Sequence, residues 1–132
     1  MTKQMYLNII LSIRDFLYNI NPQWRWYLDT VNERMNEDVF IEVLTSMQMM
    51  ENYPYKQDFM NINVYAKDNI DDVVGTIVEA LESRVIPVKD FAGGTGEIID
   101  HLEITRIDIK TLGVTESGHV VRNLSVYYKI LE

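Results

Sequence analysis

The chain contains no cysteine, and its two histidines, His101 and His119, are well separated in the sequence. Without cysteine there can be no disulfide framework, no thiolate metal site and no cysteine nucleophile. Two histidines are too few for a histidine-rich metal site. We therefore expect no metal and no other cofactor, in a chain that is compatible with a reducing cytoplasm.

Basic residues are also scarce. Twelve lysines and arginines stand against twenty aspartates and glutamates, which gives a formal net charge of -8 at pH 7. Proteins that hold DNA without regard to sequence need basic clusters that release counterions, and no such cluster is present. The acidic balance indicates a soluble protein that is repelled by nucleic acid.

The sequence has no long apolar run. A helix that spans a bilayer needs about 20 consecutive apolar residues, and Asn8, Ser12 and Arg14 interrupt the N-terminal apolar segment, so we expect neither a signal peptide nor a membrane span. The 132 residues are 47% hydrophobic and 24% charged, an ordinary globular composition. The chain therefore reads as one domain, residues 1–132.

Apolar residues at three- and four-residue spacing predict two helices. The first covers residues 3–20 and the second residues 69–85, and each is followed closely by a proline. Asn69 is a favourable N-cap for the second helix. Gly75 weakens that helix by up to ~1 kcal/mol relative to alanine, so we expect a neighbouring element to approach closely at this glycine.

Alternation of apolar and polar residues predicts five strands. In the fourth, the alternation changes phase between Ile104 and Ile107, which is the effect of a β-bulge. The second and third are expected to form an antiparallel hairpin. The strands cover residues 24–31, 39–50, 57–66, 98–112 and 119–131.

The predicted order of elements is α-β-β-β-α-β-β. Strand runs separated by helices, with connections of hairpin length, are typical of an α+β fold. We expect a mostly antiparallel sheet of about five strands with both helices packed on one face. The other face would be half covered, and its apolar residues would be available to another subunit.

No motif indicates catalysis. Residues 93–96 form the one glycine cluster, but it follows a helix and precedes a strand, the reverse of a phosphate-binding loop, so a flexible loop that orders on assembly is expected. Asp100 and His101 are adjacent and face opposite sides of a strand, while Glu103 shares a face with His101 and can pair with it. We therefore expect a protein that is not an enzyme.

Two loops are the expected contact regions, and the tyrosines of the first are possible interface anchors because aromatic residues are enriched at interfaces. The loops span residues 51–58 and 89–97. The predicted interface residues are Tyr53, Tyr55, Lys56, Phe91 and Thr95.

Several segments, in this order, carry a family resemblance. They are the opening helix at residues 6–20, strands at 39–43 and 61–65, the strand-to-helix passage at 65–74 and the closing strand at 124–130. By size and element order, the whole chain resembles the tail terminator (tail completion, or tail-to-head joining) proteins of long-tailed bacteriophages. The shared features are patterns of apolar and polar residues.

The resemblance implies a structural virion protein of the tail or neck, assembled in the cytoplasm of the host bacterium. Such proteins form a hexameric ring on the finished tail tube. The ring stops tube polymerisation and presents a surface to the head connector or stopper protein, and DNA only passes through it. The family has no catalytic residues, and no motif fixes its binding residues.

Two other interpretations stay open. The chain could be another phage component, a head-closure, neck or minor capsid protein, which would bind the portal side and leave tail length unaffected. It could also be a small cytoplasmic enzyme or ligand-binding domain with its site between sheet and helices. The absence of clustered polar residues on either helix stripe speaks against a site of that kind.

Overall fold

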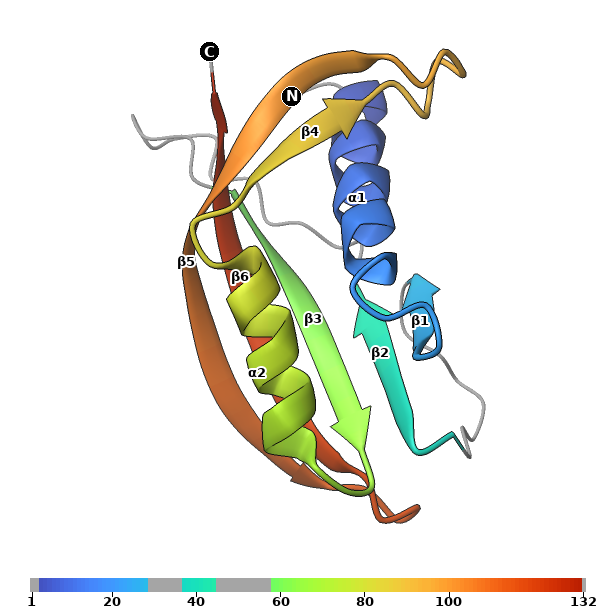
Figure 1. The fold of residues 1–132 in the computed structure, drawn as a ribbon, viewed down its shortest axis with the longest axis vertical. Coiled ribbons are helices and arrows are strands. Elements are labelled where there is room, and N and C mark those ends of the chain that lie inside the picture. The colour runs from blue at the N-terminus through green and yellow to red at the C-terminus, as the bar shows by residue number, and fades with distance from the viewer. Residues whose placement is uncertain (1–2, 29–36, 45–57, 132) are drawn as a thin grey trace.

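The computed structural model describes residues 3–28, 37–44 and 58–131 (Figure 1). These residues form α1 (Lys3–Tyr18), β1 (Arg25–Leu28), β2 (Val39–Val43), β3 (Asp58–Ala66), α2 (Ile70–Leu81), β4 (Val85–Lys89), β5 (Ile98–Val114) and β6 (Val120–Leu131). The strands make one sheet in the order β1-β2-β3-β6-β5-β4. The expected α+β class is confirmed.

The sheet has six strands where the sequence predicts about five, and the additional strand is β4. The helical spacing predicts a helix as far as Val85, whereas α2 ends at Leu81. Beyond that point Val85 is exposed while Ile86 and Val88 are buried, the alternation of a strand. The prediction is wrong here because Val85 continues the helical spacing although the backbone has already left the helix.

Strand pairing is antiparallel at every neighbour pair except β1 and β2, which are parallel. The predicted hairpin is present between β2 and β3, where Val39 lies opposite Ala66 and Val43 opposite Ile62. Residues 45–57, which complete the predicted strands and their loop, lie outside the described residues. The predicted phase change is confirmed as a register shift between Ile104 and Arg106.

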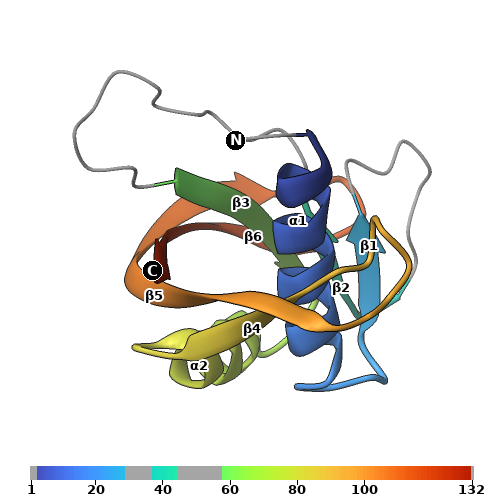
Figure 2. The ribbon, with the colours of Figure 1, turned by 90° about the horizontal axis from the view of Figure 1, so that it is seen from above.

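The sheet curls, and its concave face holds the core (Figure 2). Alternate residues of the central strands β3 and β6 point into this face and are buried. Both helices add their apolar stripes to the same cluster. The helix side chains are Ile9, Ile10, Ile13 and Leu17 from α1, and Val73, Val74, Ile77 and Leu81 from α2.

Helix α1 covers the outer edge of β4, the last strand of the sheet. The Ser12 hydroxyl accepts a hydrogen bond from the Lys89 amide at 2.9 Å, and the Asn8 side-chain oxygen accepts one from the Ala92 amide at 2.7 Å. Both α1 side chains are buried. At the rim, Asp15 forms an ion pair with Lys89 at 3.7 Å. The polar residues that interrupt the apolar stripe of α1 thus bond the end of the sheet.

Two details of α2 differ from expectation. Asn69 occupies the N-cap position with a left-handed backbone (φ 60°), and its side chain makes no capping hydrogen bond; instead its carbonyl accepts the Val73 amide. Gly75 is exposed, and a Cβ added there would meet nothing within 4 Å. The expected close approach at this glycine is therefore wrong.

Gly75→Ala should stabilise the fold by about 0.5–1 kcal/mol, because alanine loses less backbone entropy in a helix and has open space here. Urea denaturation measures the change. Gly118→Ala is the matched control: Gly118 has φ +86°, where a side chain is strained, so this variant should lose stability. A loss of stability in Gly75→Ala would contradict the open environment of α2.

Ser12→Ala should destabilise the protein by about 1–3 kcal/mol, because it leaves the partly buried Lys89 amide without its acceptor. Thr76→Ala is the control, since the Thr76 hydroxyl bonds Asp72 within its own exposed helix turn and should change stability by no more than about 0.5 kcal/mol. Equal effects of the two variants would show that α1 does not depend on this bond.

Candidate interaction surfaces

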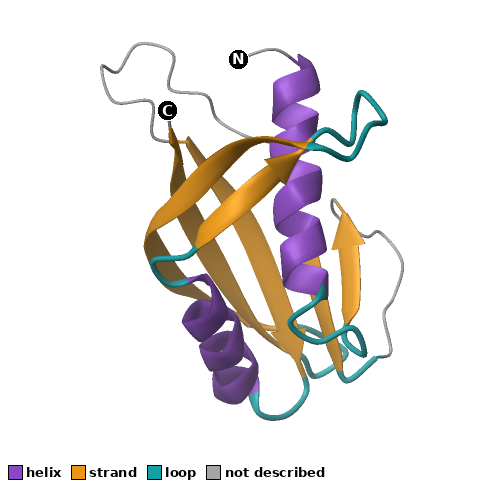
Figure 3. Ribbon diagram, turned by 45° about the horizontal axis from the view of Figure 1, so that its top comes forward, coloured by secondary structure: helices purple, strands orange, loops and turns teal. Residues whose placement is uncertain are grey.

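The predicted interface residues fall in two groups. Tyr53, Tyr55 and Lys56 lie outside the described residues. Phe91 and Thr95 lie in the connection between β4 and β5, which projects beside the N-terminal part of α1 (Figure 3). Phe91 is exposed, whereas the hydroxyl of Thr95 is engaged within the loop itself.

The β4–β5 loop is closed by its own hydrogen bonds. The Asp90 amide donates to the Glu97 carbonyl at 2.8 Å, and the Gly96 amide donates to the Asp90 carbonyl at 3.0 Å. The Asp90 carboxylate accepts the Gly93 amide and the Thr95 hydroxyl, each at 2.8 Å. The loop is therefore a folded turn, held by backbone hydrogen bonds and by the Asp90 carboxylate.

The glycine cluster serves this turn. A Cβ on Gly93 would collide with the Asp90 carboxylate, and Gly94 and Gly96 have φ of +79° and +68°, a conformation that favours glycine. The glycines thus allow the turn to close around Asp90.

Hydrogen bonds from the Thr95 hydroxyl, which has the larger effect, and from the Gly93 amide lower the pKa of Asp90. Hydrogen bonds that favour the charged carboxylate have this effect. A carboxylate whose pKa is lowered by folding contributes stability above its unfolded pKa, and the contribution is lost as pH falls through the folded value. The turn is therefore strongest at neutral pH and weakens in acid.

Three exposed apolar residues lie at the two ends of this turn. We call Phe91, Ile98 and Ile99 the loop-end patch; their exposed fractions are 37%, 57% and 50%. A shallow groove of about 330 Å³ lies between Ile99 and the start of α1, where Met5 forms part of its lining. Exposed apolar clusters of this kind mark contact sites, so Phe91 stays a candidate and Ile98 and Ile99 join it.

A second exposed surface lies along the far half of β5. Strand β4 pairs with β5 from Ile98 to Glu103, and next to this pairing the Ile104 amide donates to the Arg84 carbonyl at 2.9 Å. We call residues 106–114 the open edge, because in the described structure only β6 pairs with them. Three of its apolar side chains, Ile109, Leu112 and Val114, are exposed by 53%, 54% and 71% respectively.

The open edge has two chemically different faces. Ile107 and Ile109 lie opposite Val126 and Leu124, which are core residues, so they occupy the helix side of the sheet. The intervening residues face the other way, towards the outer side. These outer residues are charged: Arg106, Asp108 and Lys110.

The charged residues continue into an ordered outer face. The Arg106 guanidinium lies 4.1 Å from the centre of the Tyr127 ring and 3.3 Å from Asp108. The bond to Tyr127, followed by the charge of Asp108, raises the pKa of Arg106. Towards β3 the outer face becomes neutral, as the Asn123 amide donates to Asn63 at 2.8 Å.

Near β2 the outer face buries a carboxylate. Tyr65 donates a hydrogen bond to Glu42 at 2.5 Å, and Phe40 stacks on the Tyr65 ring with centroids 4.3 Å apart. Burial, followed by the bond to Glu42, raises the pKa of Tyr65. The Glu42 carboxylate thus accepts a hydrogen bond from Tyr65, whose ring is stacked on Phe40. These contacts are structural.

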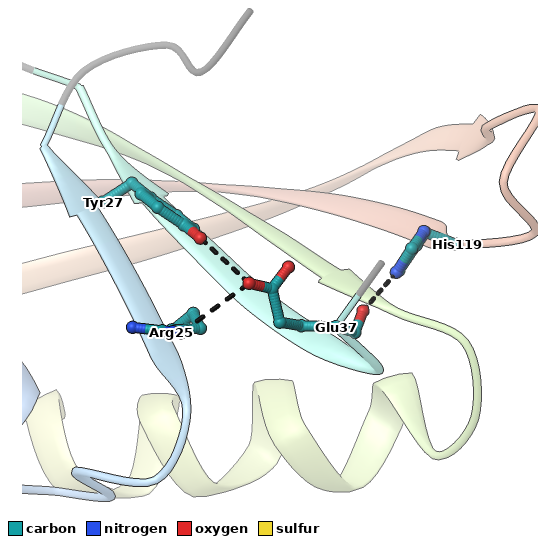
Figure 4. Close-up of polar contacts among 4 residues, drawn as sticks. All are labelled: Arg25, Tyr27, Glu37 and His119. Carbon is teal, nitrogen blue, oxygen red and sulfur yellow. Dashed lines mark hydrogen bonds and ion pairs between the residues drawn. The ribbon is translucent and has the colours of Figure 1, made fainter. Parts of the chain in front are cut away.

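A polar cluster joins β1, the start of β2 and β6 (Figure 4). The Glu37 carboxylate accepts from Tyr27 at 3.2 Å and lies 3.6 Å from Arg25. The Glu37 carbonyl lies 2.6 Å from one ring nitrogen of the buried His119, and Ser117 lies 2.6 Å from the other. Both imidazole nitrogens are therefore engaged in structural contacts.

The acidic and histidine residues near the start of β5 do not assemble into a site. The Asp100 carboxylate accepts the His101 backbone amide at 2.8 Å, and Glu103 forms an ion pair with Lys129 at 3.8 Å. Within residues 3–28, 37–44 and 58–131, no group of three or more histidine or acidic side chains could hold a metal ion.

Comparison with known proteins adds no relationship: no family model matches this chain, and no curated protein is significantly similar to it. No helix in the described part of the chain is long and apolar enough to cross a membrane. The loop-end patch and the open edge are the candidate contact surfaces of the described structure.

Thr95→Val should raise the pKa of Asp90 towards its ordinary value of 3.8, because it removes the largest cause of the lowered pKa. Thr95→Ser keeps the hydroxyl and should keep the low pKa. A carbon-detected NMR titration of the Asp90 carboxyl measures both. An unchanged pKa in the valine variant would mean that Thr95 does not hold the turn.

Proposed function

We propose that this protein is a tail terminator of a long-tailed bacteriophage, located in the tail or neck of the virion. In this role six copies close into a ring on the finished tail tube, stop its polymerisation and bind the connector of the head. The chemistry is that of contact surfaces rather than catalysis.

Two of the segments that carry the resemblance have the secondary structure expected for them, and this supports the proposal. Residues 65–74 run from the end of β3 into the first turns of α2, and residues 124–130 belong to β6, the last strand. The α+β class agrees with the same resemblance.

The observation that carries the proposal is the loop-end patch. Ile98 and Ile99 are exposed next to a turn that Asp90 holds in one arrangement. A preformed apolar surface loses little conformational entropy when a partner binds. A protein that must recognise the end of a tube or a connector requires such a surface, and we assign the patch to that contact.

The charge of the chain supports a channel role. A ring through which DNA travels must not retain phosphates, and a chain with net charge -8 repels them. The polar side chains that join β3 and β6 on the outer face are neutral amides and a hydroxyl, among them Asn61, Asn63 and Ser125. Neither feature provides the basic cluster that DNA retention needs.

Deleting the gene from the phage or prophage that carries it, followed by electron microscopy of the lysate, tests the proposal. We expect full heads beside detached, overlong tail tubes. Tails of normal length beside heads that leak DNA would assign the protein to head closure instead. Intact infectious particles would remove any virion role and favour the ligand-binding interpretation.

Complementing the deletion with Ile98→Asp tests the patch itself. A charge at the patch should prevent docking, so we expect overlong tubes as in the deletion. Tyr18→Asp introduces the same charge at an exposed position at the end of α1 and should restore normal tails. Normal tails with Ile98→Asp, in a variant shown by circular dichroism to be folded, would refute this contact.

A further inference from the structure

The two outer edges of the β4–β5 pair differ in what covers them. The outer edge of β4 is covered by α1, whose Ser12 and Asn8 accept amides from Lys89 and Ala92. The open edge of β5 has no such cover in the described structure, and it carries exposed Ile109 and Leu112. A long edge with exposed apolar side chains is a template for pairing with another strand.

We propose that the open edge pairs with the open edge of a second copy, antiparallel, about a two-fold axis through Ile109. The two sheets then continue into one another across the pair of β5 strands. Such a contact is isologous, since each copy offers the same residues to the other.

The charges select this register. Residues directly opposite in an antiparallel pair share a face of the sheet, and opposite charges there are stabilising while like charges are destabilising. With the axis at Ile109, Asp108 of each copy lies opposite Lys110 of the other. An axis at Asp108 sets the aspartates against each other, and an axis at Lys110 does the same to the lysines.

A register centred on Ile107 also pairs opposite charges, Arg106 with Asp108. In that register, however, the second strand meets the end of β4 after fewer residues have paired, because the Ile104 amide is already bonded to Arg84. It also leaves Leu112 outside the contact. The register centred on Ile109 instead pairs residues 106–112 and sets Ile109 against its own copy on the apolar face.

A groove lies where the second strand would leave the edge. It measures about 310 Å³ and lies between the C-terminal part of α2 and the residues of β5 just beyond β4, with Val78, Glu82 and Ile107 in its lining. In the Ile109 register the pairing ends with Leu112 of the second copy opposite Arg106, and the chain beyond it, with Val114, leaves the edge beside this groove. The most exposed apolar side chain of the open edge thus reaches the mouth of the groove, and binding there buries it.

This dimer is independent of the proposed ring. A closed ring of six uses a head-to-tail contact between two different surfaces, whereas the open edge contacts itself. The dimer is therefore expected of the free chain in solution, and its test does not depend on the tail phenotype.

Sedimentation equilibrium of the full chain tests the dimer. Wild type should dimerise reversibly as concentration rises. Asp108→Lys sets lysine against lysine, and Lys110→Asp sets aspartate against aspartate, so each should raise the dissociation constant about tenfold or more. Glu79→Lys makes the same charge reversal on the exposed side of α2 and should leave dimerisation unchanged.

Mixing the two single variants provides the decisive measurement. In the Ile109 register, every pair between Asp108→Lys and Lys110→Asp chains is again of opposite charge, so the mixture should form heterodimers tighter than either homodimer. The double exchange of both residues should restore the homodimer. Neither rescue is expected for a register centred on Ile107 or for a variant that has merely unfolded.

Two results would overturn the proposal. One is a wild-type chain that stays monomeric at every concentration. The other is an assembly of any size whose dissociation is insensitive to both charge reversals, which would place the contact elsewhere on the molecule.

Discussion

The bonds between α1 and the edge of β4 are the constraint on which the rest of the structure depends. A curled open sheet exposes amide and carbonyl groups along its last strand, and a buried amide without a partner costs about 1–3 kcal/mol. Ser12 and Asn8 lie one helical turn apart and accept amides from β4 and the following loop. Their spacing fixes α1 across the sheet, and the loop-end patch is consequently held beside the start of that helix.

The unequal lengths of β4 and β5 decide what remains accessible. Strand β4 has 5 residues and β5 has 17, so covering the edge of β4 leaves the far half of β5 without a neighbour on that side in the described structure. A second register shift, between Thr111 and Gly113, lies near its end. Bulges and charges such as Lys110 discourage indiscriminate edge pairing, so a strand that pairs here must set an opposite charge against Lys110.

Local periodicity predicted the helices, most strands and the bulge, because spacing and alternation report directly which side chains face the core. It failed where the outcome depends on distant residues. Val85 continues the helical spacing, and only the burial of Ile86 and Val88 in the core shows that this segment is a strand. The parallel pairing of β1 with β2 has no local signal in the sequence. Phe91 is predicted as a contact only because it lies in the loop at residues 89–97, whereas the hydrogen bonds within that loop depend on Asp90 contacting Gly93 and Thr95.

The two exposed surfaces differ in the partner that each can accept. The loop-end patch consists of side chains around a fixed turn, so it can recognise a different protein by shape and apolar contact. The open edge offers main-chain groups with alternating apolar and charged residues, so its partner must be a strand with matching alternation. Because Asp108 and Lys110 are two residues apart, a second copy of β5 that runs antiparallel sets its Lys110 opposite Asp108 and so has the matching alternation. Heterologous and isologous contacts can therefore coexist on one small domain.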